Sequence, residues 1–226
     1  MARRSLSDIS RSLSDGGNPS TKPPGGTLYQ LYDRYFAELA DQPVTLLELG
    51  VHAGESLKIF GTYFANGKII GLDIADRGTD FSAWPNIVFA AGDQTDAALL
   101  ARLCAESAPL GLDIVIDDAS HLRRASLASY RALFPFVKPG GFYIVEDWTT
   151  GYWDDWPNGG RFVPVIVEGS RVPSHDYGMV GFVKSLVDEV ASDRIRPSRL
   201  AEPTRERRLD FMQVHPEMVV LRKTGG

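Results

Sequence analysis

Short, almost wholly apolar runs alternate along the chain with segments whose apolar residues recur every three or four positions. The first pattern predicts strands buried on both faces, and the second predicts amphipathic helices. Repetition of strand and helix is typical of an α/β fold, in which helices cover both faces of a parallel sheet. The predicted strands span residues 44–50, 68–74, 86–93, 112–118 and 140–147, and the predicted helices span residues 28–39, 55–64, 94–107, 123–137 and 181–192.

The last part of the chain departs from this rhythm. Residues 207–224, RRLDFMQVHPEMVVLRKT, contain two strand-like runs separated by His215 and Pro216. Two adjacent strands joined by so short a turn form an antiparallel hairpin. We therefore predict a doubly wound, mostly parallel sheet of seven strands with a C-terminal antiparallel hairpin.

The first 26 residues differ from the rest of the chain. The pentapeptide RSLSD occurs twice, and the repeat places Leu6, Ile9 and Leu13 on one helical face. The glycine- and proline-rich run GGNPSTKPPGG then interrupts any helix. We expect residues 1–26 to form a flexible N-terminal arm, with an arm that folds over a site or a partner subunit as the alternative. Residues 27–226 then form one domain.

Composition and charge exclude several classes of protein. A net charge of −5 and a pI near 5.4 offer no basic face for nucleic acid. The single cysteine, Cys104, excludes an intramolecular disulfide and a thiolate zinc site. No apolar run approaches the roughly 20 residues that span a bilayer. We expect a cytoplasmic protein without nucleic-acid or membrane partners.

Glycines and acids follow the first three predicted strands, where doubly wound sheets bind their ligands. Glu48, Gly50 and Gly54 lie between the first strand and the first helix of the repeat, in a G-x-x-x-G spacing that suits a small group such as a carboxylate better than a pyrophosphate. Asp73 ends the second strand, where an acid can accept hydrogen bonds from ribose hydroxyls. Residues 92–94 end the third strand, where an adenine edge would lie. These features fit either an adenosyl cofactor or NAD.

Four acids and a histidine follow the fourth and fifth predicted strands. Asp117 and Asp118 begin on opposite faces of a strand, as do Glu146 and Asp147. If the two strands are neighbours, their carboxylates crowd one crevice, and a hard divalent cation such as Mg²⁺ relieves the repulsion. His121 suits a general base better than a magnesium ligand. The alternatives are helix caps and surface side chains.

Aromatic residues crowd the start of a long loop over residues 149–177. Trp148, Tyr152, Trp153 and Trp156 lie within nine positions, and the loop is rich in glycine, proline and aspartate. Long loops often carry binding residues, and aromatic rings suit the apolar face of a sugar. We expect an acceptor-side loop in which Trp148, Tyr152 and Trp153 contact the substrate. The alternative is that the aromatic side chains only pin the loop to the body.

These motifs together resemble the metal-dependent sugar O-methyltransferases of macrolide and related antibiotic biosynthesis, the mycinamicin and tylosin type. The resemblance spans residues 27–153 and rests on LLELGVHAGESLKIF, GLDI, GDQTD, DIVIDDASH and GGFYIVEDWTTGYW. It implies the Rossmann-like class I methyltransferase fold, whose sheet ends in an antiparallel pair. It also implies S-adenosylmethionine and Mg²⁺ as cofactors, and methyl transfer to a sugar hydroxyl.

The resemblance assigns roles residue by residue. It implies that Asp118, Glu146 and Asp147 bind the metal and that His121 removes the proton of the sugar hydroxyl. The residues that it implies for the cofactor site are Tyr29 or Tyr32, Glu48, Gly50, Ser56, Asp73, Asp93, Gln94 and Asp117; Gly54 joins them from the glycine spacing. We expect a small-molecule glycoside or nucleotide-sugar acceptor and a homo-oligomer.

Three rival functions remain at this point. One is a metal-dependent O-methyltransferase of a catechol or another secondary-metabolite intermediate. Another is an NAD-dependent oxidoreductase, which the glycine spacing, the predicted hairpin and the second acid pair disfavour. A third is a non-catalytic module that binds an adenosyl ligand, which the presence of His121 and all four acids disfavours.

Overall fold

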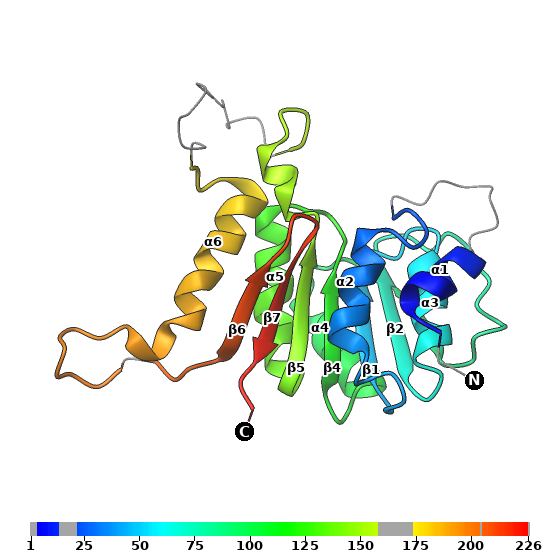
Figure 1. Cartoon of the computed structure of the whole chain (residues 1–226), viewed down its shortest axis with the longest axis horizontal. Coiled ribbons are helices and arrows are strands. Elements are labelled where there is room, and N and C mark those ends of the chain that lie inside the picture. The colour runs from blue at the N-terminus through cyan, green and yellow to red at the C-terminus, as the bar shows by residue number, and fades with distance from the viewer. Residues whose placement is uncertain (1–3, 14–21, 158–173, 204, 226) are drawn as a thin grey trace.

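The computed structural model describes residues 4–13, 22–157, 174–203 and 205–225, and its centre is one seven-stranded sheet (Figure 1). The strands are β1 (Thr45–Leu49), β2 (Lys68–Asp73), β3 (Ile87–Ala91), β4 (Leu112–Asp117), β5 (Val137–Glu146), β6 (Leu209–Val214) and β7 (Met218–Lys223). The α-helices are α1 (Leu6–Leu13), α2 (Thr27–Phe36), α3 (Glu55–Tyr63), α4 (Ala97–Ser107), α5 (Arg123–Leu133) and α6 (Gly178–Val190). Three short 3-10 helices are η1 (Phe134–Phe136), η2 (Trp148–Tyr152) and η3 (Ser192–Arg194). The predicted α/β fold class is confirmed.

The strand order is β3-β2-β1-β4-β5-β7-β6, and the first five of these strands are parallel. Strand β7 lies antiparallel between β5 and β6, so the predicted hairpin is confirmed. Its turn is closed by the N–H of His215, which donates to the carbonyl of Met218 at 2.8 Å. The chain reaches the edge at β3 and returns beside β1 as β4. The topological switch point, where such sheets bind ligands, therefore lies between β1 and β4.

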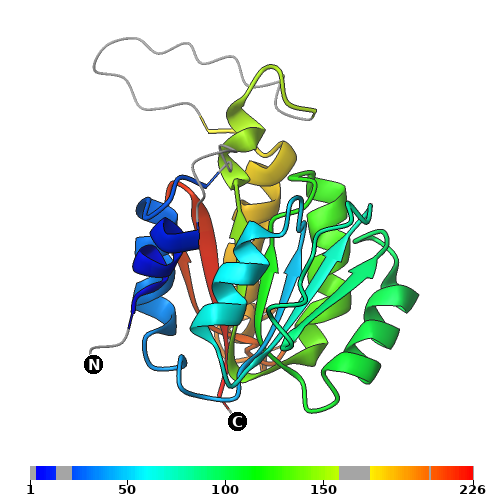
Figure 2. The same cartoon turned by 90° about the vertical axis from the view of Figure 1, so that its right-hand side faces the viewer.

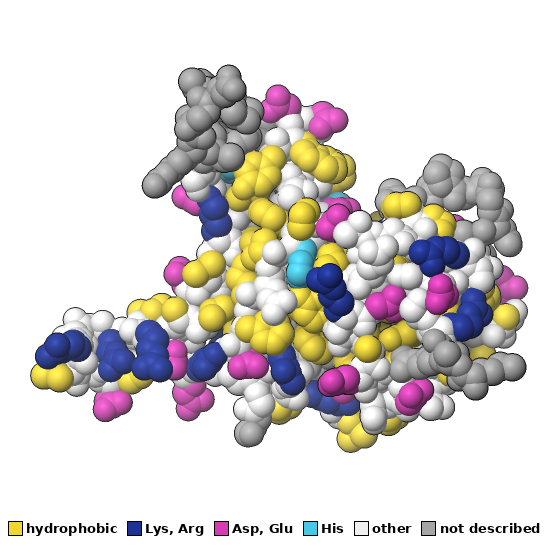
Figure 3. Space-filling view, in the orientation of Figure 1, with side chains coloured by type: hydrophobic (Ala, Val, Ile, Leu, Met, Phe, Trp, Pro, Cys, Tyr) yellow, Lys and Arg dark blue, Asp and Glu magenta, His cyan; other side chains and the backbone are white. Residues whose placement is uncertain are grey.

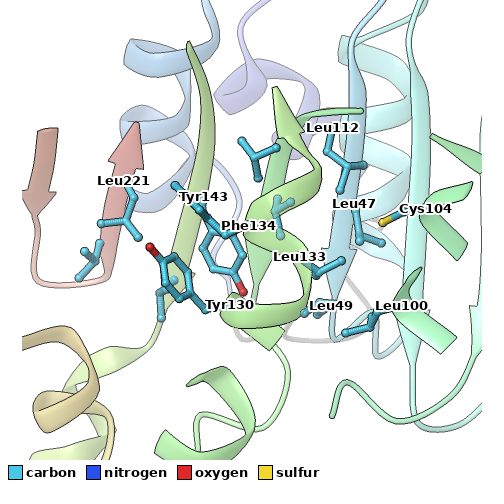
Figure 4. Packing of buried hydrophobic residues seen from close by; sticks show 14 of the residues in the cluster. Leu47, Leu49, Leu100, Cys104, Leu112, Tyr130, Leu133, Phe134, Tyr143 and Leu221 are labelled. Carbon is cyan, nitrogen blue, oxygen red and sulfur yellow. The ribbon is translucent and has the colours of Figure 1, made fainter. Parts of the chain in front are cut away.

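Two hydrophobic clusters cover the two faces of the sheet. Alternate residues of β1 supply both, since Leu46 packs toward α1, α2 and α3 while Leu47 packs toward α4, α5 and α6. Figure 2 shows the helices on either side of the sheet, and Figure 4 shows the second cluster, in which Leu47 lies near Cys104 and Tyr143 near Tyr130. Glu48 is the exception in β1, because it carries a carboxyl group and is fully buried.

The described part of the N-terminal arm, residues 4–13, packs against the rest of the protein. Leu6 and Ile9 are buried in the cluster that α2 and α3 form, as their shared helical face predicts. Asp33 of α2 accepts hydrogen bonds from the backbone N–H and the hydroxyl group of Ser7, at 3.3 and 2.8 Å. Apolar burial and this bonding hold α1 in place, while the division into a flexible arm over residues 1–26 and a domain over residues 27–226 stays a prediction. Residues 1–3 and 14–21 lie outside the described residues.

The carboxyl ends of the parallel strands and the segment that follows α6 lie at opposite ends of the molecule (Figure 1). Figure 3 shows Lys and Arg side chains gathered on that segment, and apolar side chains gathered near η2, above the strand ends. None of the helices in the described ranges is long and apolar enough to cross a membrane.

Candidate functional site

Two adjoining cavities open at the switch point, beyond the carboxyl ends of the strands. Their volumes are about 370 and about 380 Å³. Both are lined by Gly50, Asp73, Ile74 and Ala119, so they form one continuous cleft. This is the position at which the glycines and acids of the sequence predict a ligand.

The turn after β1 requires glycine at residue 50. Gly50 has a φ of +87°, and a Cβ atom there would lie 2.2 Å from the carbonyl oxygen of Asp118. The turns that follow β1 and β4 are therefore in direct contact, which no larger residue permits. Gly54, at φ +81°, precedes the first turn of α3. Gly50 brings the cleft floor against the acidic turn of β4, whereas Gly54 lies against the side chains of Phe81 and Thr79.

Asp73 lies at the junction of the two cavities and is held by the backbone. It accepts hydrogen bonds from the N–H groups of Val51 and His52, both at 2.8 Å. Burial raises the pKa of Asp73, but the hydrogen bonds from His52, Ala75 and Val51 outweigh it and lower the pKa below the usual value. The carboxylate is therefore ionised and fixed in orientation, as an acceptor for ligand hydroxyl groups requires.

The second cavity is bordered by the turn after β3. Asp93 lies there and accepts a hydrogen bond from the N–H of Thr95 at 2.7 Å. Gln94 is buried, and its side-chain oxygen accepts the N–H of Ser120 at 3.1 Å while its amide donates to Asp117 at 3.2 Å. Gln94 thus ties the turn after β3 to the turn after β4, in addition to lining the cleft.

The residues predicted for the cofactor site fall into two groups in the structure. Those that line the cleft are Tyr29, Gly50, Ser56, Asp73, Asp93 and Gln94. Those behind its wall are Tyr32, Glu48, Gly54 and Asp117. Glu48 still acts on the cleft, since it accepts a hydrogen bond from Ser56 at 2.8 Å. Asp117 is 2% exposed and lies beneath the cleft, where it supports Gln94.

Asp118, His121 and Asp147 form a cluster at the mouth of the cleft. One ligand atom from each lies within 4.8 Å of the others, which is compatible with a shared cation. The Nε2 atom of His121 lies 3.9 Å from Asp118 Oδ1 and 3.7 Å from Asp147 Oδ2. All three residues line the first cavity. The predicted neighbourhood of the acidic ends of β4 and β5 is present.

The backbone at this cluster adopts a conformation that side chains rarely tolerate. His121 has a φ of +51° and Asp147 a φ of +50°, and His52 is the remaining non-glycine residue with positive φ in the described chain. Such residues cost roughly 1–3 kcal/mol each and occur preferentially at functional sites. His121 and Asp147 therefore line the cleft at the cost of backbone strain.

Glu146 does not join the other predicted metal ligands in this structure. It is the last residue of β5, 1% exposed, and its carboxylate accepts a hydrogen bond from the hydroxyl group of Tyr32. Asp147 follows outside the strand and faces the cleft. The alternation of side chains along a strand separates the two acids, and His121 takes the third position beside Asp118 and Asp147.

A lysine that the sequence did not mark as functional lies among these acids. The Nζ atom of Lys22 is 2.7 Å from Asp118 Oδ2, 2.9 Å from Glu146 Oε1 and 3.6 Å from Glu48 Oε1. Burial lowers the pKa of Lys22, but the charges of Asp118, Glu146 and Glu48 outweigh it, so the pKa lies well above the usual value. Lys22 is therefore an ammonium ion. A lone lysine between threonine and proline carries no sequence signal for this role.

The single positive charge of Lys22 does not neutralise the carboxylates of the acid cluster. Burial raises the pKa of Glu48 to about 8, despite the opposing charge of Lys22. Burial and the charge of Asp118 raise the pKa of Glu146 to about 6. Burial also raises the pKa of Asp118 and Asp147. Buried oxygen donors with raised pKa values are chemically suited to a hard divalent cation, which would bind them in ionised form.

These values predict how the stability of the metal-free protein depends on pH. A carboxyl group with a folded pKa above its unfolded value of about 4.3 holds its proton more tightly when folded, so its contribution to stability falls as pH rises through that interval. Between pH 5 and 8 we expect the denaturation midpoint to fall by several degrees, at roughly 2–4 °C per kcal/mol. The fall should be smaller in Glu48→Gln, and equal falls in the two proteins would contradict the assignment.

Some aromatic residues at the start of the loop pack η2 onto the rest of the protein, and others lie nearer the candidate site. The indole N–H of Trp148 donates to the carbonyl of His215 at 2.7 Å, and the ring of Tyr152 contacts that of Trp148 at 6.1 Å. Trp148 therefore holds η2 against the hairpin, and Tyr152 holds it against His175, whose ring lies 4.8 Å away. Trp153 is 47% exposed, and its ring lies 6.2 Å from that of Trp156.

Trp156 is the aromatic residue that reaches the acid cluster. Its indole N–H donates to the carbonyl of His121 at 3.2 Å, and the two rings lie 5.8 Å apart. The aromatic cluster in the sequence includes Trp156, but nothing in the spacing distinguishes it from its neighbours as the contact to His121. The remainder of the predicted acceptor-side loop, residues 158–173, lies outside the described residues.

Comparisons with known proteins agree with this geometry. No protein-family model matches the chain. The chain is 34% identical over 204 residues to the 8-demethyl-8-alpha-L-rhamnosyl tetracenomycin-C 2'-O-methyltransferase of Streptomyces olivaceus, a match that covers 86% of this chain and 50% of that protein. It is 37% identical over 178 residues to the demethylmacrocin O-methyltransferase of Streptomyces fradiae, covering 74% and 42%. The chain thus spans about half the length of the curated relatives it matches.

Among solved structures, MycE methyltransferase from the mycinamycin biosynthetic pathway, in complex with Mg, SAH and mycinamycin VI, matches with a TM-score of 0.75 and 31% identity. The match covers 99% of this chain and 54% of that one. The fold is therefore that of the class I methyltransferases. Within that class, the chain belongs to the family of sugar O-methyltransferases of antibiotic biosynthesis, as the sequence motifs predict.

Proposed function

We propose that this chain transfers a methyl group from S-adenosylmethionine to a sugar hydroxyl group, with Mg²⁺ at the acid cluster and His121 as the general base. The observation that supports this most directly is the position of Asp118, His121 and Asp147, which line the same cavity as Gly50 and Asp73. A cofactor in the cleft and a substrate at the acid cluster would then meet at one point.

The cleft fits an adenosyl cofactor. The carboxylate of Asp73 is fixed by backbone N–H groups at the junction of the cavities, where ribose hydroxyl groups would donate to it. The turn at Gly50 lets the backbone approach the methionine part, and the cavity beside Asp93 and Gln94 would receive the adenine. MycE, with the same fold, is in complex with SAH.

Asp118 and Asp147 would hold the metal ion, with Glu146 as the further predicted ligand. A bound Mg²⁺ lowers the pKa of a coordinated hydroxyl group and fixes its position. His121 Nε2 faces this point and would accept the hydroxyl proton, while the unpartnered Nδ1 atom is buried. The hydroxyl oxygen forms the new bond to the methyl carbon, whose bond to sulfur breaks, so the products are the methyl ether, S-adenosylhomocysteine and protonated histidine.

The acceptor that we favour is a sugar on a glycosylated natural product or a nucleotide sugar. The curated relatives are O-methyltransferases whose names include a rhamnosyl tetracenomycin and mycinamicin VI as substrates. Trp156 lies beside His121 and Trp153 lies beside Trp156, and such rings suit the apolar face of a sugar. A catechol or another diol would use the same metal chemistry and is the second candidate. The homo-oligomeric state and the cytoplasmic location stay predictions.

The first test is calorimetric titration of the metal-stripped protein with S-adenosylhomocysteine, with NAD as the control ligand, repeated after addition of Mg²⁺. We expect S-adenosylhomocysteine to bind and NAD to give no heat. Binding of NAD without S-adenosylhomocysteine would overturn the proposal in favour of an oxidoreductase. Methylation assays with glycosides and catechols follow, and turnover of catechols alone would replace the sugar assignment.

A further inference from the structure

Lys22 occupies a cation position between two of the predicted metal ligands. Its side chain is 11% exposed, and its ammonium group lies 2.7 Å from one oxygen of Asp118 and 2.9 Å from one of Glu146. It also lines the first cavity, together with Tyr29. Lys22 is therefore a buried ammonium ion that binds two carboxylates of the candidate site directly.

Lys22 and the metal would share the carboxylate of Asp118, whose Oδ2 contacts Lys22 while Oδ1 lies 3.9 Å from His121, and they would compete for Glu146. An oxygen atom that accepts a charge-assisted hydrogen bond from an ammonium group has less electron density to offer to Mg²⁺, which requires close to six oxygen ligands at short distance. Two cations that share Asp118 in a buried site also repel each other strongly, because screening is weak there. Binding of the metal by Asp118 and Glu146 therefore opposes binding of Lys22.

The residues around Lys22 link its position to the cofactor side of the cleft. Residues 22–26 lead directly into α2, which carries Tyr29 at the cavity and Tyr32 against Glu146. The N–H of Gly25 donates to Ser10 of α1 at 2.8 Å, so the turn also rests on the N-terminal helix. Release of the ammonium group would remove the contact that holds this turn against the acids.

We propose that Lys22 is an internal counter-ion that holds the metal-free site together and that the divalent cation displaces it on binding. The inference rests on the proposed function, since it assumes that a divalent cation binds the acid cluster. Lys22 is a positioning residue, which keeps Glu48, Asp118 and Glu146 in place until the metal arrives.

The test is metal affinity in the absence of substrate. Calorimetry with Mg²⁺ and Mn²⁺ compares the wild type with Lys22→Met, which keeps the length of the side chain and removes the charge. We expect binding to be about tenfold tighter, or more, in Lys22→Met, within the usual range for coupled binding equilibria. Lys22→Arg, which keeps the charge, should show no such gain. Lys68→Met at the amino end of β2 is the matched control and should bind as the wild type does.

Unchanged or weaker metal binding by Lys22→Met would overturn the inference while leaving the proposed function intact. Absence of metal binding by the wild type and both Lys22 variants would overturn both together. A second measurement on the wild type does not depend on how the variant folds. Saturating Mg²⁺ should speed hydrogen exchange at the amides of Gly25 and Gly26, and unchanged exchange in metal-saturated protein would overturn the displacement of Lys22.

Discussion

Replacing His121 with asparagine should lower kcat by about 10²–10⁴-fold while leaving the affinities for S-adenosylhomocysteine and Mg²⁺ close to those of the wild type. The loss is expected because no other described side chain at the acid cluster can take the hydroxyl proton as a neutral base. Asparagine is the better substitution here, because His121 has a φ of +51° and asparagine tolerates this conformation more readily than alanine does. The measurements are single-turnover kinetics and calorimetry on the same preparation.

The comparison with His121→Ala separates chemistry from backbone strain. If the imidazole group is the base, both variants lose turnover, and the His121→Asn variant retains normal thermal stability. Wild-type turnover in His121→Asn would eliminate the general-base role. A large loss of metal affinity in His121→Asn would instead make His121 a metal ligand, a role that its distance of 3.7 Å from Asp147 leaves within reach.

Asp118→Asn should remove metal binding almost completely, with an affinity loss of at least ~100-fold and a loss of turnover on the order of 10³-fold or more. Asp118 lies within reach of Asp147 and His121 on one side and of Lys22 on the other, so it is the acid on which both cation positions depend. Excess Mg²⁺ should not restore the variant, whereas it should restore wild-type enzyme that has been inactivated by a chelator.

Asp154→Asn is the matched control for Asp118→Asn. Asp154 is an exposed acid that follows η2, and it is not among the residues that line either cavity. Its variant should bind the metal and turn over substrate as the wild type does. Full activity of wild-type enzyme in excess chelator would remove the metal from the mechanism and, with it, the reason for the expected loss in Asp118→Asn.

The sheet and its ligand-binding end were predictable because local patterns carry them. Apolar runs such as LDIVIDD fix β4 and its acidic end, and the break at His215 and Pro216 fixes the hairpin. The convergence of the acids of β4 and β5 follows from neighbouring parallel strands ending at one edge. The alternation of side chains predicts different directions for Glu146 and Asp147, but the positive φ of Asp147, just beyond β5, has no signal in the sequence.

The contacts that the sequence did not reveal are made between residues far apart in the chain. Lys22 contacts Glu146, which follows it by 124 residues in the chain. A lysine in a glycine- and proline-rich run has no periodicity that predicts such a contact. The burial of α1 was underestimated for a related reason, since eight residues with three apolar positions do not show what they pack against. Trp156 was recognised only as one aromatic residue among several.

The acid cluster depends on the C-terminal hairpin, which binds Asp147 and Trp148. The N–H of Asp147 donates to the carbonyl of Glu217 at 2.9 Å, and the carbonyl of His215 receives the indole N–H of Trp148. Both bonds come from the tip of the hairpin, which is synthesised only after the acceptor-side loop and α6. Because a domain generally folds as a unit, Asp147 is fixed only when the C-terminal strands have joined the sheet. Competence to bind a divalent cation would then be among the last properties that the growing polypeptide acquires.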